Sequence, residues 1–349
     1  MREEVKVIET EKKNFRYISV LRIIAMFSVI MIHSVCTPVT YYSESYSHLE
    51  LQISCILRSV FISFAVPIFL MISGALFLNP SKDISTNKIL TKYVKRIFLD
   101  ILIFGSIFAL MEIVFTNKHF SPIDILTALK NALTGNTWGH LWYLYLIISL
   151  YLVTPVFRAF AKNSEKKDFL IVLGIIYFFT MVLPLISSIL NIKTGFYVPF
   201  TTASFFYLAG HAVHTDMIKL KNWHCLLLII LSFVYIIGMS FVKNSLIIYG
   251  AQIKNVSWLG IMTVPLYCLV KNLVTNNNER KIETFLASMS FGVYIFHAVF
   301  LNFIYKATPF TPVNYPLVLV VSIAFVITSI FSIFVTWIFK KIPYLNKLV

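Results

Sequence analysis

Long apolar runs separated by short polar segments dominate this sequence. A helix of about 20 residues crosses the hydrocarbon core of a bilayer, and each run approaches or exceeds that length. Pro67 in the second run and Pro155 in the fourth predict kinks or broken turns, which membrane helices tolerate where the backbone lines protein or water, and Pro265 lies inside the eighth run. The pattern predicts an all-α polytopic membrane protein with about ten transmembrane helices. They are expected at residues 17–36, 54–78, 96–116, 141–160, 168–190, 199–214, 224–242, 256–273, 284–305 and 315–339.

Positive charge is distributed unevenly among the polar segments, and this fixes the predicted orientation. With ten spans, 22 of the 30 Lys and Arg residues fall on one side, six fall on the other and two lie within spans. Positively charged loops stay in the cytoplasm, so both termini are expected there and the number of spans is even. The predicted organisation is a cytoplasmic tail at 1–16, a ten-span domain at 17–340 and a cytoplasmic tail at 341–349.

Composition agrees with a membrane protein and excludes other classes. The chain is 58% hydrophobic and 13% charged, with a mean hydropathy of +0.81, whereas soluble domains are about 25% charged. The net charge of +15 does not indicate a nucleic-acid partner, because the Lys and Arg residues lie in loops between apolar runs. The bilayer is therefore the expected partner, and no nucleic acid is expected.

The first apolar run carries two ionisable residues, Arg22 and His33, eleven positions apart. At about 100° per residue both side chains lie on one helix face, and the rise of ~1.5 Å per residue separates them by about 16 Å. Ionisable groups at such depths are costly and usually functional. The simpler alternative is that Arg22 reaches the near interface and that the neutral His33 bonds to a backbone carbonyl.

Other polar side chains within or beside the runs are further candidates for function. A lone histidine within a membrane is usually structural, but His33, His140, His211 and His297 together make at least one functional histidine the favoured interpretation. Asp100 follows Arg96 by four residues, so an ion pair within one helix is its expected partner. Only one pair of histidines, His211 and His214, has metal-ligand spacing on one helix, and a structural role is favoured for that pair. No metal site is therefore expected.

The first outer loop, residues 37–54, is rich in tyrosine and has no Lys or Arg. This composition suits the binding of a sugar or polyol, and it equally suits an aromatic belt at the membrane interface.

Four stretches, taken together, resemble the acyltransferase-3 family of bacterial integral membrane acyltransferases. The family's hallmark is an arginine, ten residues and then a histidine, which Arg22 and His33 match. Further matches in the same order are VPIFLMISG (66–74), HLWYLYLIISLYLVTPVFR (140–158) and SFGVYIFH (290–297), and the terminal KKIPYLNKLV looks similar too. The resemblance covers essentially the whole chain and implies ten spans. In one departure, TKYVKRIFLD replaces the paired arginines at the start of the third span, which weakens bidentate recognition of phosphate.

The resemblance implies transfer of an acyl group, usually acetyl, from cytoplasmic acyl-coenzyme A to a hydroxyl of a cell-envelope glycan outside the bacterial plasma membrane. Acetyl-CoA is then the acyl donor and co-substrate. His33 is the expected general base, because a histidine titrates near neutral pH, and Arg22 is expected to orient the donor. Lys92, Lys95 and Arg96 are expected to bind its phosphates. The candidates for substrate or oxyanion binding are Arg58, His140, Trp142, Tyr143 and His297.

Two alternatives stay open at this point. His33 could first be acylated and then pass the group on, which is nucleophilic rather than general-base catalysis. The chain could also transport a small polar solute such as serine, as proposed for the similar membrane half of vancomycin-resistance serine racemases. Binding of coenzyme A discriminates between acyl transfer and transport. A purely structural membrane protein is disfavoured by the buried Arg22 and His33.

Overall fold

The computed structural model describes residues 15–80, 82, 84–192, 194–196, 199–241, 257–275, 278 and 280–349. Most of the predicted N-terminal tail, residues 1–14, lies outside this part of the chain. Within it the fold is helical and contains no strand, which confirms an all-α protein. The α-helices are α2 (Arg16–Tyr42), α3 (His48–Ile62), α4 (Ala65–Phe77), α5 (Thr86–Lys88), α6 (Lys95–Asp100), α7 (Ser106–Asn117), α8 (Ile123–Thr134), α9 (Trp142–Asn163), α10 (Lys166–Tyr177), α11 (Leu183–Leu190), α12 (Thr202–His214), α13 (Asn222–Ser240), α14 (Ser257–Leu273), α15 (Lys281–Ala307) and α16 (Leu317–Lys341).

Eight helical stretches among the described residues are long and apolar enough to cross a membrane. Several combine consecutive helices, because short π-helical turns at 89–94, 101–105 and 178–182 continue one helix into the next. The predicted sixth and eighth spans correspond to the shorter helices α12 and α14. A multi-pass membrane protein is confirmed, whereas the number ten and the cytoplasmic placement of the termini stay predictions.

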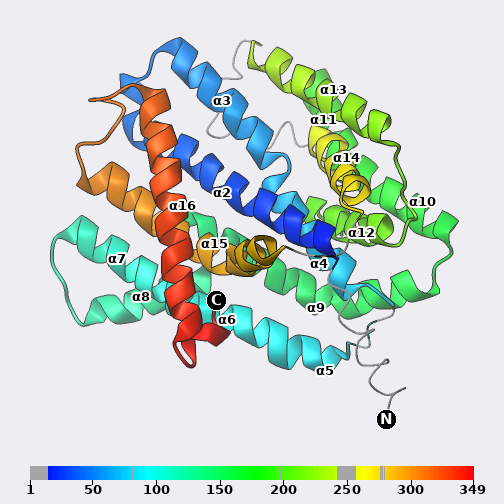
Figure 1. The fold of residues 1–349 in the computed structure, drawn as a ribbon, viewed down its shortest axis with the longest axis horizontal. Coiled ribbons are helices and arrows are strands. Elements are labelled where there is room, and N and C mark those ends of the chain that lie inside the picture. The colour runs from blue at the N-terminus through cyan, green and yellow to red at the C-terminus, as the bar shows by residue number, and fades with distance from the viewer. Residues whose placement is uncertain are drawn as a thin grey trace.

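Helix α2, which carries Arg22 and His33, runs through the centre of the bundle (Figure 1). It packs against α3, α4, α15 and α16, and α4 in turn packs along α12. The hairpin of α7 and α8 lies at one end of the molecule, and α10, α11, α13 and α14 lie towards the other (Figure 1). About half of the α2 residues are buried, and Arg22 and His33 are themselves half-buried.

The second predicted span is broken, as Pro67 suggested. Helix α3 ends at Ile62 and α4 begins at Ala65, which places Pro67 in the first turn of α4. Proline fits a first turn because the amide hydrogen that it lacks has no partner there. Pro155, by contrast, lies within the continuous helix α9.

Helix α8 occupies residues that the sequence pattern assigned to an outer loop. It packs against α7 and against the π-helical turn Ile101–Gly105, where a Cβ on Gly105 would lie 3.2 Å from the Ala132 Cβ. Gly135 ends α8 with a φ of 80°, a left-handed conformation that glycine adopts without strain. The Thr137 hydroxyl then donates to the carbonyl of Gly105 over 3.0 Å. The chain at 135–141 is thus held beside the middle of the third predicted span.

A bidentate ion pair joins the first turns of α2 and α15. Arg16 donates from Nε and from a terminal nitrogen to the two oxygens of Glu283, over 2.7 and 2.8 Å. We expect Arg16→Ala to lower the Tm of the detergent-solubilised protein, because bidentate pairs are among the stronger ones. Lys219→Ala, which removes the exposed pair with Asp216, is the control. Equal Tm values for the two variants would contradict this expectation.

Candidate functional site

Three histidines from distant parts of the chain meet at the centre of the bundle. His33 comes from α2, His140 from the 3₁₀ turn before α9, and His297 from α15. The ring centroids of His33 and His297 are 4.9 Å apart, those of His140 and His297 are 5.1 Å apart, and those of His33 and His140 are 6.5 Å apart. The sequence had named each residue separately, and the fold brings them together.

Backbone carbonyls hold two of the three rings. His297 Nδ1 lies 2.7 Å from the carbonyl oxygen of Tyr294 and 3.2 Å from that of Val293. His140 Nε2 lies 3.2 Å from the carbonyl oxygen of Ile295. Among the described residues, no group of three or more His, Cys, Asp or Glu side chains is placed to hold a metal ion.

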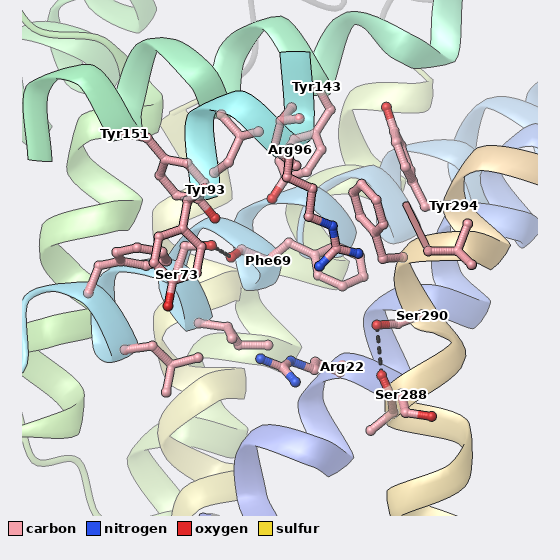
Figure 2. Close-up of a pocket in the computed structure, with 18 of the residues that line it drawn as sticks. Arg22, Phe69, Ser73, Tyr93, Arg96, Tyr143, Tyr151, Ser288, Ser290 and Tyr294 are labelled. Carbon is pink, nitrogen blue, oxygen red and sulfur yellow. Dashed lines mark hydrogen bonds between the residues drawn. The ribbon is translucent and has the colours of Figure 1, made fainter. Parts of the chain in front are cut away.

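A cavity of about 880 Å³, here called the basic cavity, opens beside Arg22. Figure 2 shows the guanidinium groups of Arg22 and Arg96 in this cavity, with tyrosines and serines around them. No aspartate or glutamate of the described chain lines it. Its cationic lining residues are Arg22, Lys82, Lys88, Arg96 and Lys340, and its tyrosines are Tyr93, Tyr143, Tyr151 and Tyr294. Such a cavity has the size of a cofactor site and favours an anionic ligand.

Arg96 is the best-placed cation for a ligand in this cavity. Its guanidinium carbon lies 5.0 Å from the ring centroid of Phe291, and its buried Nε has no hydrogen-bond partner among the described residues. The predicted ion pair between Arg96 and Asp100 is wrong, because neither carboxylate oxygen of the buried Asp100 has a hydrogen-bond partner in the described chain. The reason is geometric: Arg96 turns into the cavity and packs on Phe291.

The segment that carries Lys82 is anchored from α9. Arg158 donates one hydrogen bond to the carbonyl of Phe77 and another, of 2.7 Å, to the carbonyl of Lys82. Burial and the nearby positive charge of Arg22 both lower the pKa of Lys82. Cations crowded in this way are relieved by a bound anion.

A second cavity, of about 510 Å³ and here called the polar cavity, borders the histidine cluster. His33 and His140 line it, together with the non-helical chain at 136–138. Its other polar lining residues are Thr37, Thr40, Tyr41, Glu112, Asn131, Asn302 and Lys306. Non-helical backbone at membrane depth is tolerated where it lines such a cavity.

Glu112 organises one wall of the polar cavity. It accepts a hydrogen bond of 3.0 Å from Trp138 Nε1 and forms an ion pair of 3.3 Å with Lys306. The Lys306 ammonium also lies 5.0 Å from the ring centroid of Tyr41. Of the tyrosines in the predicted first outer loop, Tyr41 alone lines this cavity. The arrangement combines aromatic rings with hydrogen-bonding groups, which suits a polyhydroxylated ligand.

Tyr294 forms a partition between the two cavities. It lines the basic cavity, its ring centroid lies 5.9 Å from that of His140 and 6.2 Å from that of His297, and its hydroxyl donates to the His140 carbonyl. Tyr143 packs against it, with ring centroids 5.6 Å apart. Tyr294 thus joins the lining of the basic cavity to the histidine cluster, two of whose members line the polar cavity.

Some of the site residues predicted from the sequence line one of the two cavities, and others line neither. Arg22 and His33 share α2 but line different cavities, as their predicted separation requires. Arg58 is half-buried in α3 and lines neither cavity. Tyr143 lines the basic cavity, whereas Trp142 lines neither cavity and is 54% exposed.

Only part of the predicted phosphate-binding segment lines a cavity. Arg96 lines the basic cavity, and Lys92 and Lys95 are exposed on the same helical stretch. Sequence reasoning missed Lys82, Lys88 and Lys340, which line the cavity. Lys82 and Lys88 follow the VPIFLMISG stretch closely, and that proximity was the available signal.

Comparison with known proteins agrees with this architecture. A family model described as an acyltransferase domain, of acyltransferase family 3, matches residues 15–339. No curated protein and no solved structure matches the chain. The match spans nearly the whole chain and includes α2 with Arg22 and His33, whereas Lys340, which lines the basic cavity, lies one residue beyond it. The chain belongs to the acyltransferase-3 family.

Proposed function

We propose that this protein is a membrane O-acyltransferase of the bacterial plasma membrane. It moves an acyl group, most simply acetyl, from cytoplasmic acyl-CoA to a hydroxyl of a cell-envelope glycan outside. One observation carries the proposal: His33 and His140 line a polar cavity, and Tyr294, whose ring lies beside those of His140 and His297, lines a cationic cavity. In this proposal α2 enters the bilayer from the cytoplasm, so the basic cavity faces the donor and the polar cavity faces the acceptor.

The donor assignment rests on charge. Coenzyme A carries phosphates, and arginine binds phosphate through paired charge-assisted hydrogen bonds. Arg22 and Arg96 enter one cavity together, and Lys82, Lys88 and Lys340 line it as well. In this proposal the phosphates bind these cations and the thioester reaches past Tyr294 towards His33.

The chemical step is proposed as direct transfer. His33 lines the polar cavity and not the basic one, which supports a general base acting on the acceptor. His33 takes the hydroxyl proton as the oxygen bonds to the thioester carbonyl carbon. The carbon–sulfur bond then breaks, and the coenzyme A thiolate leaves with the proton that His33 returns. Arg58 and Tyr143 are the proposed oxyanion stabilisers.

Binding of acetyl-CoA to the purified protein tests the donor half. Arg96→Gln should weaken binding at least about tenfold, because a hydrogen bond to a charged group contributes about 1.5–3 kcal/mol. Calorimetric titration in detergent measures the Kd, and the exposed Lys167→Gln is the control. A Lys92→Gln/Lys95→Gln double variant tests whether the exposed lysines contribute to acetyl-CoA binding. We expect this variant to bind acetyl-CoA more tightly than Arg96→Gln does. Absence of binding by the wild type would overturn the proposal.

The acceptor half has its own expected result. Asn302→Ala should raise the KM for a glycan acceptor about tenfold and leave the Kd for acetyl-CoA unchanged, because Asn302 lines only the polar cavity. Trp142→Phe changes an exposed side chain outside both cavities and is the control. A loss of acetyl-CoA affinity in Asn302→Ala would contradict the assignment of the two cavities.

A further inference from the structure

We propose that Glu112 and Lys306 form the part of the polar cavity that selects the acceptor, and that this pair selects an uncharged sugar. One hydroxyl of the sugar binds the carboxylate, and a neighbouring hydroxyl binds the ammonium. A sugar that carries a carboxylate or a phosphate at this position is disfavoured. The inference rests on the proposed function, because it deepens the assignment of the polar cavity to the acceptor.

The polar cavity carries one charged side chain of each sign. In the part of the chain that the structure describes, Glu112 is the one carboxylate that lines it, and Lys306 is the one Lys or Arg. The basic cavity differs, because five Lys and Arg side chains line it and no Asp or Glu of the described residues does. A cluster of one sign attracts an ion of the other sign, whereas a balanced pair gives a bound ion no net counter-charge. The polar cavity therefore favours a ligand without charge.

Both members of the pair keep hydrogen-bonding capacity for such a ligand. The Glu112 carboxylate accepts a hydrogen bond of 3.0 Å from Trp138 Nε1, and Lys306 Nζ lies 3.3 Å from each of its oxygens. A carboxylate offers about four acceptor sites and an ammonium three donors, so these contacts do not saturate either group. Hydrogen bonds between an ionised group and a hydroxyl are stronger than those between neutral groups. The pair therefore suits two neighbouring hydroxyls, one that donates and one that accepts.

The pair is accessible from the cavity. The side chain of Glu112 is 45% exposed and that of Lys306 is 21% exposed, and both line the cavity. Aromatic rings fix the groups around them: the Lys306 ammonium lies 5.0 Å from the ring centroid of Tyr41, and Trp138 stacks on Phe108 with centroids 4.8 Å apart. An ion pair that only joined α7 to α15 would not need this access. Glu112 and Lys306 are thus placed for contact with a ligand.

The pair lies in the same cavity as the histidines but away from them. His297 and Lys306 are nine residues apart on the continuous helix α15, and a rise of ~1.5 Å per residue separates their backbones by about 14 Å along the axis. Ala298, Asn302 and Lys306, on successive turns of α15, all line the cavity. A sugar at the pair therefore meets the protein at a point other than the hydroxyl that reacts at His33. We expect the pair to determine which acceptor binds and to leave the chemical step unchanged.

Binding of two matched sugars to the full-length protein in nanodiscs tests the selection without turnover. Phenyl β-D-xyloside is uncharged, and phenyl β-D-glucuronide differs from it by one carboxylate at C5. Saturation-transfer NMR gives both Kd values, and their ratio does not depend on how much of a variant is folded. The wild type should bind the xyloside about tenfold more tightly, because the carboxylate loses hydration without gaining a net counter-charge.

Variants that change one charge should move this ratio in opposite directions. Glu112→Gln leaves Lys306 unopposed and should shift the ratio about tenfold towards the glucuronide, whereas Lys306→Gln should shift it by a similar factor towards the xyloside. The double variant is balanced again and should return to the wild-type ratio. Glu44→Gln and Lys118→Gln make the same changes of charge at exposed positions outside both cavities, and they should leave the ratio unchanged.

Kinetics separate selection of the acceptor from catalysis. With a glycan acceptor, Glu112→Gln should raise the KM for the acceptor about tenfold and leave kcat near the wild-type value, because the pair contacts a part of the acceptor that does not react. A fall in kcat at an unchanged KM would place Glu112 in the chemical step and overturn the inference.

The outcomes distinguish this inference from the proposed function. If neither sugar binds, or if the wild type and the three pair variants share one ratio, the pair does not select the acceptor, and acyl transfer by the wild type still decides the proposed function. If the ratio responds as expected while the wild type transfers no acyl group, the proposed function fails and the polar cavity is still a site for an uncharged sugar.

Discussion

His33→Ala should lower the rate of acyl transfer about a thousandfold and leave the Kd for acetyl-CoA at its wild-type value. The loss is large because a neutral hydroxyl is a poor nucleophile and a positioned general base contributes about 10²–10⁴-fold. Donor binding is spared because His33 lines the polar cavity, while Arg22, Arg96 and Lys82 line the basic one. In the proposed reaction the same helix carries one residue for the donor and one for the acceptor.

Release of coenzyme A in the presence and absence of a glycan acceptor, together with calorimetric titration of acetyl-CoA, measures both quantities. His211→Ala removes a buried histidine outside the two cavities and serves as the control. A His33→Ala variant that loses donor binding would move His33 to the donor site. An acetylated His33 peptide trapped from the wild type would replace direct transfer by the acyl-histidine relay.

Periodicity and charge predict much of this fold, because the bilayer restricts what an apolar run can form. The run at 17–36 predicts α2, and the angular offset between Arg22 and His33 follows from helix geometry alone. Helix α8 was missed because its residues form a short amphipathic stretch rather than a long apolar one. Its position depends on the close approach of Ala132 to Gly105, which is a tertiary contact.

The site was predictable as residue types and not as an arrangement. His140 and His297 are 157 positions apart in the sequence, and only the packing of α15 beside α2 and the turn before α9 brings their rings within 5.1 Å. Of the predicted basic segment only Arg96 lines the basic cavity, because Lys92 and Lys95 point outward on a stretch whose side-chain directions depend on the π-helical turn at 89–94. Charge in a sequence therefore indicates a cationic cavity more reliably than it names the residues that line it.

The crossing of α4 and α12 leads to the prediction with the largest effect on folding. A Cβ on Gly74 would lie 1.7 Å from the carbonyl oxygen of Tyr207, and a Cβ on Gly210 would lie 1.9 Å from that of Met71. Both obstacles are helix backbone, which cannot rotate away as a side chain would. Small residues allow membrane helices to approach this closely.

Gly74→Ala should therefore abolish the folded protein or destabilise it by at least about 3 kcal/mol, the upper end of what overpacking usually costs. Gly174→Ala in α10 is the matched control, because a Cβ there meets nothing within 4 Å, and alanine's better helix propensity makes it neutral or slightly stabilising. Fluorescence-detected size-exclusion chromatography and Tm in detergent measure both variants. Since α4 also supplies Phe69 and Ser73 to the basic cavity, a separation of its backbone from α12 should weaken acetyl-CoA binding in any protein that survives. A monodisperse Gly74→Ala protein with wild-type Tm and affinity would show that the two helices do not cross this closely.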